Sequence, residues 1–212
     1  MTRWGMVIDL TKCIGCGACA IACKETNKVP SNIWRKVPDC DKTDYPERQR
    51  LFLPMSCMHC GEPSCLHVCP TGATYKRSDG IVEIDYKLCL GCGYCILSCP
   101  YQARTIFTEE FDFAVNAMSQ EPGRDPDLDR IGVCTKCNFC RPRLDAGLSK
   151  GLQPGLDPEA TPACVVTCSA KALYFGDMDD PDSIVSYLIK ENKAVRLQEE
   201  LKTSPSVYYV VG

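Results

Sequence analysis

The sequence predicts an α+β fold in which short strands and helices surround cysteine-rich loops, and an internal repeat is the main reason. Two runs of four cysteines, starting at Cys13 and Cys89, share the spacing C-x2-C-x2-C-x3-C. A short β-branched segment ending at Asp9 precedes the first run by the same distance as a segment ending at Asp85 precedes the other. Each repeat therefore predicts a strand, a cysteine loop and a helix that carries the last cysteine. The two aspartates are expected to close the turn after the strand.

The cysteine content indicates a metal-binding protein. There are 18 cysteines among 212 residues, a content typical of disulfide scaffolds and metal proteins. The residues before Cys13 contain no apolar signal region, so we expect no export signal, and C-x2-C pairs have the spacing of metal ligands. The net charge of -3 disfavours a nucleic-acid surface. Because no apolar run reaches about 20 residues, any membrane association is expected to go through another subunit.

The run from Cys89 to Pro100 has the form C-x2-C-x2-C-x3-C-P, which is typical of a 4Fe-4S cluster site. In proteins with two such clusters the fourth cysteine ligates the other cluster, so one run requires a partner run. Gly91 and Gly93 are expected to adopt positive φ where the backbone approaches the bulky cluster.

The partner run lies directly upstream and has a middle gap of four residues. Its cysteines are Cys57, Cys60, Cys65 and Cys69. The residues at 71–75 and 78–80 predict a β-hairpin that leads into the Cys89 run. Together the two runs predict one two-cluster ferredoxin-like module. His59 and His67 are not expected to be ligands, because the cysteine set is already complete.

The fourth unit is split and offers five candidates for four positions. They are Cys134, Cys137, Cys140, Cys164 and Cys168. Proline and glycine in the segments 24–54, 105–132 and 144–163 predict long irregular surface loops. Such loops are either docking surfaces for partner subunits or plain solvated connections.

The C-terminal part predicts a helix and a strand. A helix is expected from Ser183 to Glu191, with Asp180 or Asp182 as its N-cap. The apolar tail from Val207 to Val211 reads as a strand that packs on the core or meets a partner. We therefore divide the chain into an outer module (residues 1–56 and 101–180), an inner module (57–100) and a C-terminal helix and tail (181–212).

Seven short motifs across nearly the whole chain resemble the four-cluster iron-sulfur subunit of molybdopterin oxidoreductases in the dimethyl sulfoxide reductase superfamily, the type found in polysulfide, arsenate and dimethyl sulfoxide reductases. They are Met6 to Asp9, Cys69 to Ala73, Cys99 to Tyr101, Cys137-x2-Cys140-x2-Arg143, Pro162 to Cys164, Phe175 to Asp177, and Asp180-Pro181. The chain departs from the family pattern at Ser169, where proline is frequent, and in a longer loop before Cys164.

The resemblance implies two pseudo-symmetric, bacterial ferredoxin-like modules with long inserted loops. It implies four 4Fe-4S clusters that form a wire for electron transport, with no catalysis by this chain itself. One end would meet a molybdenum or tungsten bis-pterin catalytic subunit, and the other a membrane quinone subunit or another redox carrier. The chain would then be membrane-associated through these partners, on a membrane face that the sequence does not specify.

Three other classes of protein are weighed against this interpretation. A stand-alone soluble polyferredoxin is the main alternative, although it would not need the long inserted segments and the tail. A zinc module is disfavoured because zinc takes four ligands, usually from two well-separated C-x2-C pairs, whereas these runs place three cysteines close together with a fourth after a gap of three residues. An enzyme with its own chemistry is disfavoured because a radical-type C-x3-C-x2-C spacing and a nucleotide-binding glycine loop are both absent from the sequence.

The last cysteine of each run is expected to serve the cluster of the paired run. The sixteen expected ligands are Cys57, Cys60 and Cys65 with Cys99; Cys89, Cys92 and Cys95 with Cys69; Cys13, Cys16 and Cys19 with Cys168; and Cys137, Cys140 and Cys164 with Cys23. Cys40 and Cys134 are then spare. A rival scheme uses Cys134 and Cys137 and leaves Cys140 free, and spacing alone does not exclude it. The resemblance favours Cys140, because Phe139 and Arg143 match the family pattern.

Overall fold

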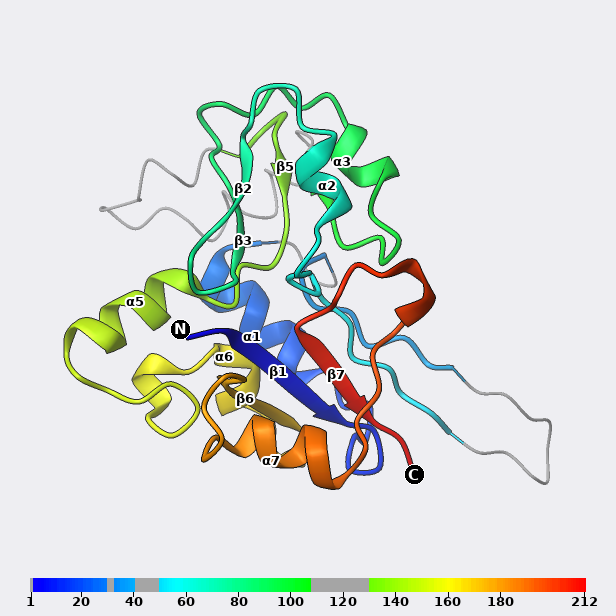
Figure 1. Ribbon diagram of the computed structural model, residues 1–212, viewed down its shortest axis with the longest axis vertical. Coiled ribbons are helices and arrows are strands. Elements are labelled where there is room, and N and C mark those ends of the chain that lie inside the picture. The colour runs from blue at the N-terminus through cyan, green and yellow to red at the C-terminus, as the bar shows by residue number, and fades with distance from the viewer. Residues whose placement is uncertain (1, 30–32, 41–49, 108–129) are drawn as a thin grey trace.

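A three-stranded sheet joins the first and last strands of the chain (Figure 1). The computed structural model describes residues 2–29, 33–40, 50–107 and 130–212. In the sheet, β1 (Trp4–Asp9) lies between β6 (Leu173–Asp177) and β7 (Val207–Val210). It is antiparallel to β6 and parallel to β7. The strand predicted before the first cysteine run and the packing of the tail on the core are both confirmed.

Alternation along the strands buries the sheet on both faces. Met6 and Ile8 point into the main core together with Tyr209, whereas Val7 and Tyr208 point to a second apolar cluster. Successive side chains of a strand lie on opposite faces, so an uninterrupted apolar strand requires cover on both sides. The apolar sequence of β7 is therefore explained by its place inside the protein.

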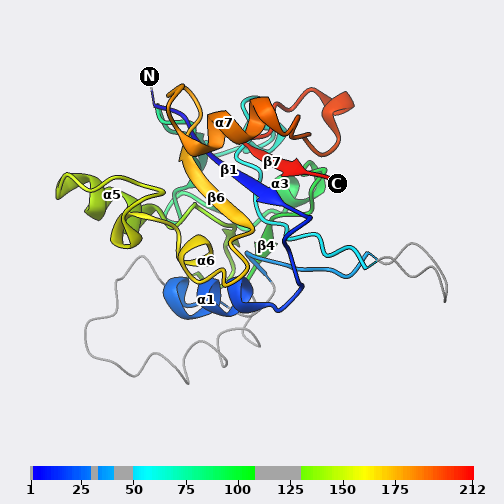
Figure 2. The same cartoon turned by 90° about the horizontal axis from the view of Figure 1, so that it is seen from below.

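Helices provide that cover (Figure 2). Helix α7 (Ile184–Glu191) packs against β6 and β1 on one face, and α1 (Ala18–Asn27) and α6 (Ala163–Val166) lie on the other. The predicted C-terminal helix is confirmed, but its N-cap is Ser183 rather than either aspartate. The Asp180 carboxylate instead accepts the N–H of Asp182 at 3.0 Å, one turn before the helix. No helix among the described residues is long and apolar enough to cross a bilayer.

The middle of the chain forms the upper part of Figure 1. Strands β2 (Thr74–Lys76) and β3 (Val82–Ile84) make the predicted antiparallel hairpin. Helices α2 (Ser64–His67) and α3 (Tyr94–Leu97) pack against each other beside it. Helix α3 ends before Cys99, so the last cysteine of this run follows the helix, whereas α1 carries Cys23 within it.

The predicted turn role of the two aspartates is confirmed. The Asp9 carboxylate accepts hydrogen bonds from the N–H and the hydroxyl of Thr11, at 3.0 and 2.6 Å. The Asp85 carboxylate accepts the N–H of Lys87 at 2.9 Å. Each side chain thus fixes the turn that leads from a strand into a cysteine run.

The prediction of irregular surface loops is wrong for several of the described parts. Trp34 and Arg35 are each only 2% exposed. Residues 36–40 form a backbone ladder with residues 51–55. Strand β4 (Thr105–Ile106) pairs with β5 (Cys134–Thr135).

Helix α5 (Arg141–Ser149) covers the first part of the third predicted loop, 144–163, which also contains the 3-10 turn η2 (Pro158–Ala160). A second 3-10 turn, η3 (Glu199–Leu201), precedes β7. Residues 30–32, 41–49 and 108–129, which belong to the first two predicted loops, lie outside the described residues. The prediction failed because proline and glycine content indicates irregular backbone but does not indicate which side chains are buried.

A charged contact ties the β2–β3 hairpin to α5. The Arg77 guanidinium donates two hydrogen bonds to the Asp145 carboxylate, at 2.8 and 2.9 Å, and a third to Asp79. Bidentate geometry makes this stronger than an ordinary surface pair. It helps to fix the middle part of the chain on the part that contains the large sheet.

The buried tail yields a test of the fold. Replacing Tyr209 by alanine should destabilise the protein by about 3 to 5 kcal/mol, as is typical for a large aromatic side chain lost from a core. Tyr209 is 0% exposed, and its hydroxyl donates to the Pro54 carbonyl at 3.0 Å. The measurement is the denaturant midpoint of cluster bleaching under anaerobic conditions.

Tyr187 provides the matched control, because it lies on α7 and is 58% exposed. The midpoint of the Tyr187→Ala protein should correspond to a free energy of unfolding within about 0.5 kcal/mol of that of the unmodified protein. Equal midpoints for the two variants would show that β7 does not belong to the stable core.

Candidate iron-sulfur centres

Cysteine side chains from both ends of the chain meet next to the large sheet. We call Cys13, Cys16, Cys19 and Cys168 the Cys13 group. Burial raises the pKa of Cys13, and the neighbouring thiols of Cys168 and Cys16 raise it further. Burial likewise raises the pKa of Cys19 to about 11, and its neighbours include Cys13 and Cys168. Thiols that influence one another in this way lie close together in space.

A second group is the most deeply buried of the four. We call Cys23, Cys137, Cys140 and Cys164 the Cys23 group, and all four are buried. Burial raises the pKa of Cys137 to about 12, with Cys164 and Cys140 as contributing neighbours. The pKa of Cys23 is raised by burial and then by the same three thiols.

The remaining cysteines of the predicted set gather in the middle part of the chain. Burial raises the pKa of Cys60 to about 12, and the thiols of Cys57, Cys65 and Cys99 add to this rise; these four form the Cys57 group. Cys69, Cys89, Cys92 and Cys95 line one small cavity and form the Cys89 group. The structure thus brings cysteines from different runs of the sequence close together, and the four predicted ligand sets stay a prediction.

The loops that carry these thiols have a backbone suited to a bulky group. Gly91 has φ +66, and a Cβ at this position would collide with the carbonyl oxygen of Gly132. Gly93 is also left-handed and is the N-cap of α3. Phe139 and Cys140 also have positive φ, at 55 and 54, although neither is a glycine. Such strained residues cost about 1 to 2 kcal/mol each and persist where other interactions hold them.

Polar groups donate hydrogen bonds to several of these sulfurs. The backbone N–H of Thr74 donates to the Cys69 Sγ at 3.4 Å, and that of Ala172 donates to the Cys168 Sγ at 3.3 Å. The Asn27 Nδ2 lies 3.5 Å from the Cys140 Sγ. Donors of this kind favour the thiolate form and tune the potential of a cluster.

Buried cations accompany the thiols, and sequence reasoning missed them. Arg35 donates from its Nη2 to the Cys164 Sγ at 3.3 Å, and its Nη1 has no hydrogen-bond partner among the described residues. Burial alone would lower the pKa of Arg35, but the thiols of Cys164, Cys137 and Cys19 raise it above its ordinary value. A buried cation requires nearby negative charge. The thiolates and core of an iron-sulfur cluster would supply that charge, so the residues present fit this cofactor.

Two further buried cations lie near the middle groups. Arg104 is 4% exposed, and the thiols around it include Cys57, Cys65 and Cys95. Lys136 is 2% exposed, and its Nζ donates to the carbonyl oxygens of Val82 and Cys137. The only available signal for these residues was their closeness in sequence to cysteines, which does not distinguish a buried cation from an exposed one.

Comparison with protein families indicates the same type of cofactor. Two models described as "4Fe-4S dicluster domain" match residues 12–73 and 48–115. Both include the Cys57 run, and the split fourth run lies beyond them. Two dicluster domains and 18 cysteines are consistent with four 4Fe-4S clusters.

Relatives extend over the whole chain. A selenate reductase subunit of Mesobacillus selenatarsenatis is 40% identical, covering 98% of this chain and 72% of the relative. A protein of Halobacterium salinarum assigned as a dimethyl sulfoxide reductase iron-sulfur subunit is 40% identical over 100% of this chain and 80% of its own. The menaquinone reductase iron-sulfur cluster-binding subunit of Nitratidesulfovibrio vulgaris is 39% identical, with 98% and 88% covered.

The chain belongs to the iron-sulfur electron-transfer subunits of the dimethyl sulfoxide reductase superfamily. The resemblance predicted from short motifs is thereby confirmed, as is the 4Fe-4S cofactor type.

His59 has a structural place in this iron-sulfur subunit. It is fully buried and stacks on Phe139, with ring centroids 3.8 Å apart. Its Nδ1 accepts the N–H of Val82 at 3.0 Å. Burial, with Lys136 and Arg104 nearby, lowers the pKa of His59 well below its ordinary value, so the ring is neutral. The other histidine, His67, is exposed at the end of α2.

The two spare cysteines of the iron-sulfur subunit occupy different surroundings. Cys40 is half-buried, at the end of the ladder that begins at Lys36. Cys134 is 1% exposed and packs with Cys65 and Cys95, not with the Cys23 group. Its hydrogen bond lowers the pKa of Cys95. This location favours Cys140 over Cys134 in the Cys23 group, in agreement with the family pattern.

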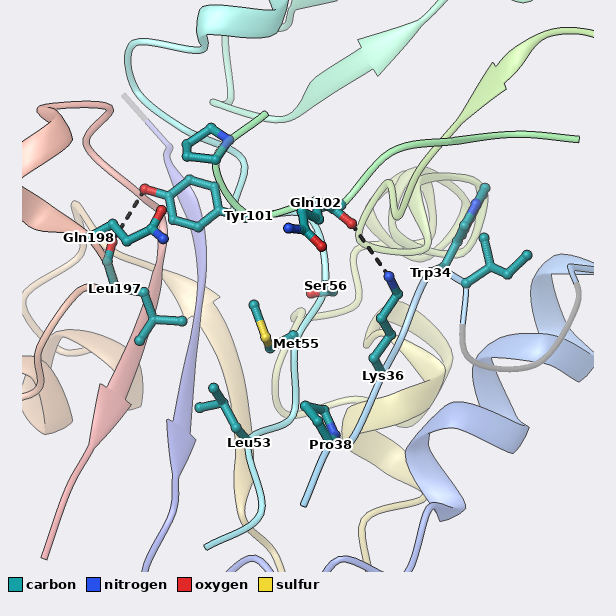
Figure 3. Close-up of a pocket in the computed structure, with 13 residues that line it drawn as sticks. Trp34, Lys36, Pro38, Leu53, Met55, Ser56, Tyr101, Gln102, Leu197 and Gln198 are labelled. Carbon is teal, nitrogen blue, oxygen red and sulfur yellow. Dashed lines mark hydrogen bonds between the residues drawn. The ribbon is translucent and has the colours of Figure 1, made fainter. Parts of the chain in front are cut away.

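A cavity of about 510 Å³ lies beside the Cys57 group (Figure 3). Its wall contains Ser56 and Pro100, the neighbours of Cys57 and Cys99 in the chain, and apolar side chains such as Met55 and Leu53. Lys36 donates from its Nζ to the Gln102 carbonyl at 3.5 Å across one side. No carboxylate, histidine or thiol is among its described lining residues, so the wall is mainly apolar, with Lys36 and Tyr101 as its titratable side chains.

The position of Arg35 predicts an electrostatic effect on the neighbouring clusters. Replacing Arg35 by glutamine should lower a cluster reduction potential by on the order of 100 mV, because a unit charge a few Å away contributes a few kcal/mol at moderate dielectric. Potentiometric titration followed by electron paramagnetic resonance measures the shift. Arg196→Gln is the control, because the Arg196 guanidinium stacks on Tyr208 and pairs with Glu199. Equal potentials in both variants would contradict the charge assignment.

Proposed function

We propose that this chain is a non-catalytic subunit that carries four 4Fe-4S clusters and relays electrons between two partners. One partner is a molybdenum or tungsten bis-pterin catalytic subunit, and the other is a membrane quinone subunit or another redox carrier. The observation that carries the proposal is the distribution of exposure. Cys16 and Cys92 are exposed, whereas all four cysteines of the Cys23 group are buried. A wire needs accessible ends and an insulated middle.

The sixteen grouped cysteines are the proposed thiolate ligands. The Cys13, Cys23, Cys57 and Cys89 groups each take one cluster, and the last cysteine of each run serves the cluster of its paired run. Cysteine spacing and the convergence of each group support this assignment. The same pairing supports an outer module of residues 1–56 and 101–180 and an inner module of 57–100, related by pseudo-symmetry. Residues 181–212 would complete the outer module, since β7 pairs with β1.

Contacts between groups support one continuous order along the wire. Cys19 of the Cys13 group has Cys164 of the Cys23 group as a neighbour. Lys136 precedes Cys137 of the Cys23 group and is close enough to influence the pKa of Cys65. Arg104 lies between Cys65 and Cys95, which belong to the Cys57 and Cys89 groups. Electrons would then pass through the groups in the order Cys13, Cys23, Cys57, Cys89, or the reverse.

Exposed apolar side chains surround both ends of this order. Ile14 is 63% exposed beside Cys13, and Ile21 is 54% exposed on α1. Leu90 and Leu97, in the Cys89 run, are 72% and 87% exposed. Apolar side chains left in water next to redox ligands support docking of partner subunits at both ends.

The residues of the chain have distinct tasks in this relay. When bound, the clusters supply one-electron chemistry. The cysteines hold them, and the backbone N–H groups of Thr74 and Ala172 stabilise ligand sulfur. Arg35 and Arg104 offset negative charge inside the two modules, and burial keeps water from the Cys23 group. Substrate chemistry would belong to the catalytic partner.

The names of the relatives support these partner classes. One relative is a subunit of a selenate reductase and another a subunit of a menaquinone reductase. The first name refers to the reduction of an oxyanion, and the second refers to a quinone. For this chain we therefore propose both types of contact.

Native anaerobic purification tests the relay. The chain should copurify with a larger subunit that contains molybdenum or tungsten, and it should carry about 16 iron atoms. Metal analysis and size-exclusion chromatography provide the measurement. A chain that elutes alone with all its iron would instead be a stand-alone polyferredoxin. A content of about 12 iron atoms per chain would show that the chain holds three clusters rather than four.

The ligand assignment in the split run predicts opposite results for two cysteines. Cys140→Ser should lose one cluster signal or convert it to a three-iron form, because Cys140 belongs to the Cys23 group. Cys134→Ser should keep all four signals in electron paramagnetic resonance. If the Cys134 variant lost a cluster while the Cys140 variant kept it, the rival scheme would be correct.

A further inference from the structure

A fifth thiol lies in the Cys89 group. Cys134 lines the same small cavity as the four cysteines of that group, although it belongs to a different run of the sequence. It is 1% exposed, so its thiol is oriented toward the protein interior. The proposed relay does not use this side chain. Its surroundings are the same as those of the four proposed ligands.

The contact between Cys134 and Cys95 indicates which iron Cys134 could bind. The Sγ atoms of Cys95 and Cys134 lie 3.4 Å apart. Thiolates bound to different iron atoms of one cubane point outward from its centre, so they cannot touch each other in this way. Two sulfurs in contact can therefore serve only the same corner of a cluster, one at a time. Cys134 lies where it could take the iron of Cys95, and the other three corners remain with Cys69, Cys89 and Cys92.

The backbone holds Cys134 firmly in this position. In β5 it pairs with Ile106 of β4, and its N–H donates to the Cys89 Sγ at 3.4 Å. One residue thus contacts two members of the Cys89 group, one through its main chain and one through its side chain. A shift in χ1 is all that is needed to move the Cys134 sulfur relative to its neighbours.

A buried cation faces the same sulfur. The Arg104 Nη1 lies 3.9 Å from the Cys134 Sγ and donates to the Thr74 Oγ1 at 3.1 Å. Its Nη2 is buried without a hydrogen-bond partner among the described residues. Arg104 therefore places a buried positive charge next to the Cys134 sulfur. It can stabilise either Cys95 or Cys134 as the thiolate.

We propose that Cys134 is a reserve ligand that replaces Cys95 at one iron of the cluster in the Cys89 group. In the exchange the Cys134 sulfur bonds to iron and the iron–Cys95 bond breaks. The proton of the Cys134 thiol passes to the Cys95 sulfur across their contact, so charge and oxidation state are unchanged. Where Cys95 is replaced, the Cys134 thiol releases its proton to a water or buffer base as it binds the iron, so the fourth iron is retained. This inference rests on the proposed ligand assignment.

Three variants of the chain, purified anaerobically in its complex, test the exchange by electron paramagnetic resonance. Cys95→Ala should keep the four-iron signal of this cluster, because Cys134 takes over. Cys95→Ala combined with Cys134→Ala should lose it or convert it to a three-iron signal. Cys19→Ala, at the equivalent third position of the first run, is the control and should lose or convert its own cluster. A three-iron signal as large in Cys95→Ala as in the double variant would overturn the proposal.

The same three variants distinguish a failure of the reserve-ligand proposal from a failure of the sixteen-cysteine ligand assignment on which it rests. If the double variant kept every four-iron signal, Cys95 would not be a ligand, and the ligand assignment itself would fail. If Cys95→Ala did not accumulate as a complex, oxidation of otherwise unmodified ligands would provide the test. Under limited ferricyanide, Cys134→Ala should form the three-iron signal several-fold faster than the unmodified chain. Cys40→Ala, which removes the other spare cysteine, should not. Equal rates for Cys134→Ala and Cys40→Ala would overturn the proposal.

Discussion

The convergence of thiols from distant parts of the chain is the constraint on which the rest of the structure depends. Cys168 lies beside Cys13, although 154 residues separate them in the sequence. The strand that follows Cys168 then pairs with the strand that precedes Cys13, and β7 completes the sheet. The short strands of the middle part, two or three residues long, have little stability of their own. In this account, bonds to the clusters replace much of the apolar core that a chain of this size would otherwise need.

Charge balance follows from the same constraint. Bringing sixteen thiolates and their clusters into one small protein would be costly without nearby positive charge. Arg35, Arg104 and Lys136 are buried beside the thiols, and the net charge of the whole chain is only -3. These cations contact the cysteines in different ways. Arg35 donates directly to a sulfur of the Cys23 group, whereas Lys136 donates to the backbone carbonyl of Cys137. Clusters held by the Cys23 and Cys57 groups would therefore have surroundings that differ in polarity, which is one of the ways in which proteins set potentials.

The cysteine spacing predicted the 4Fe-4S type of cofactor, and the sixteen-ligand assignment built on that spacing stays a prediction. Ligands follow a strict local spacing, so Cys89 to Cys99 announce a cluster loop without any knowledge of tertiary structure. The strand before Cys13, the hairpin before Cys89 and helix α7 were also predictable from local patterns. Trp34 and Arg35 were not, because a proline-rich segment gives no sign that two of its side chains are buried. The contact of Cys134 with Cys95 was equally hidden, since it joins two runs that spacing treats as separate.

The central claim is that cluster binding and folding are one process. The most direct test compares the holo chain with a cluster-free chain in anaerobic buffer, by far-ultraviolet circular dichroism during denaturant titration. The account predicts a cooperative transition for the holo chain and none for the cluster-free chain, because the four thiol groups then have nothing to hold them together. A cooperative transition with native-like dichroism in the cluster-free chain would contradict it.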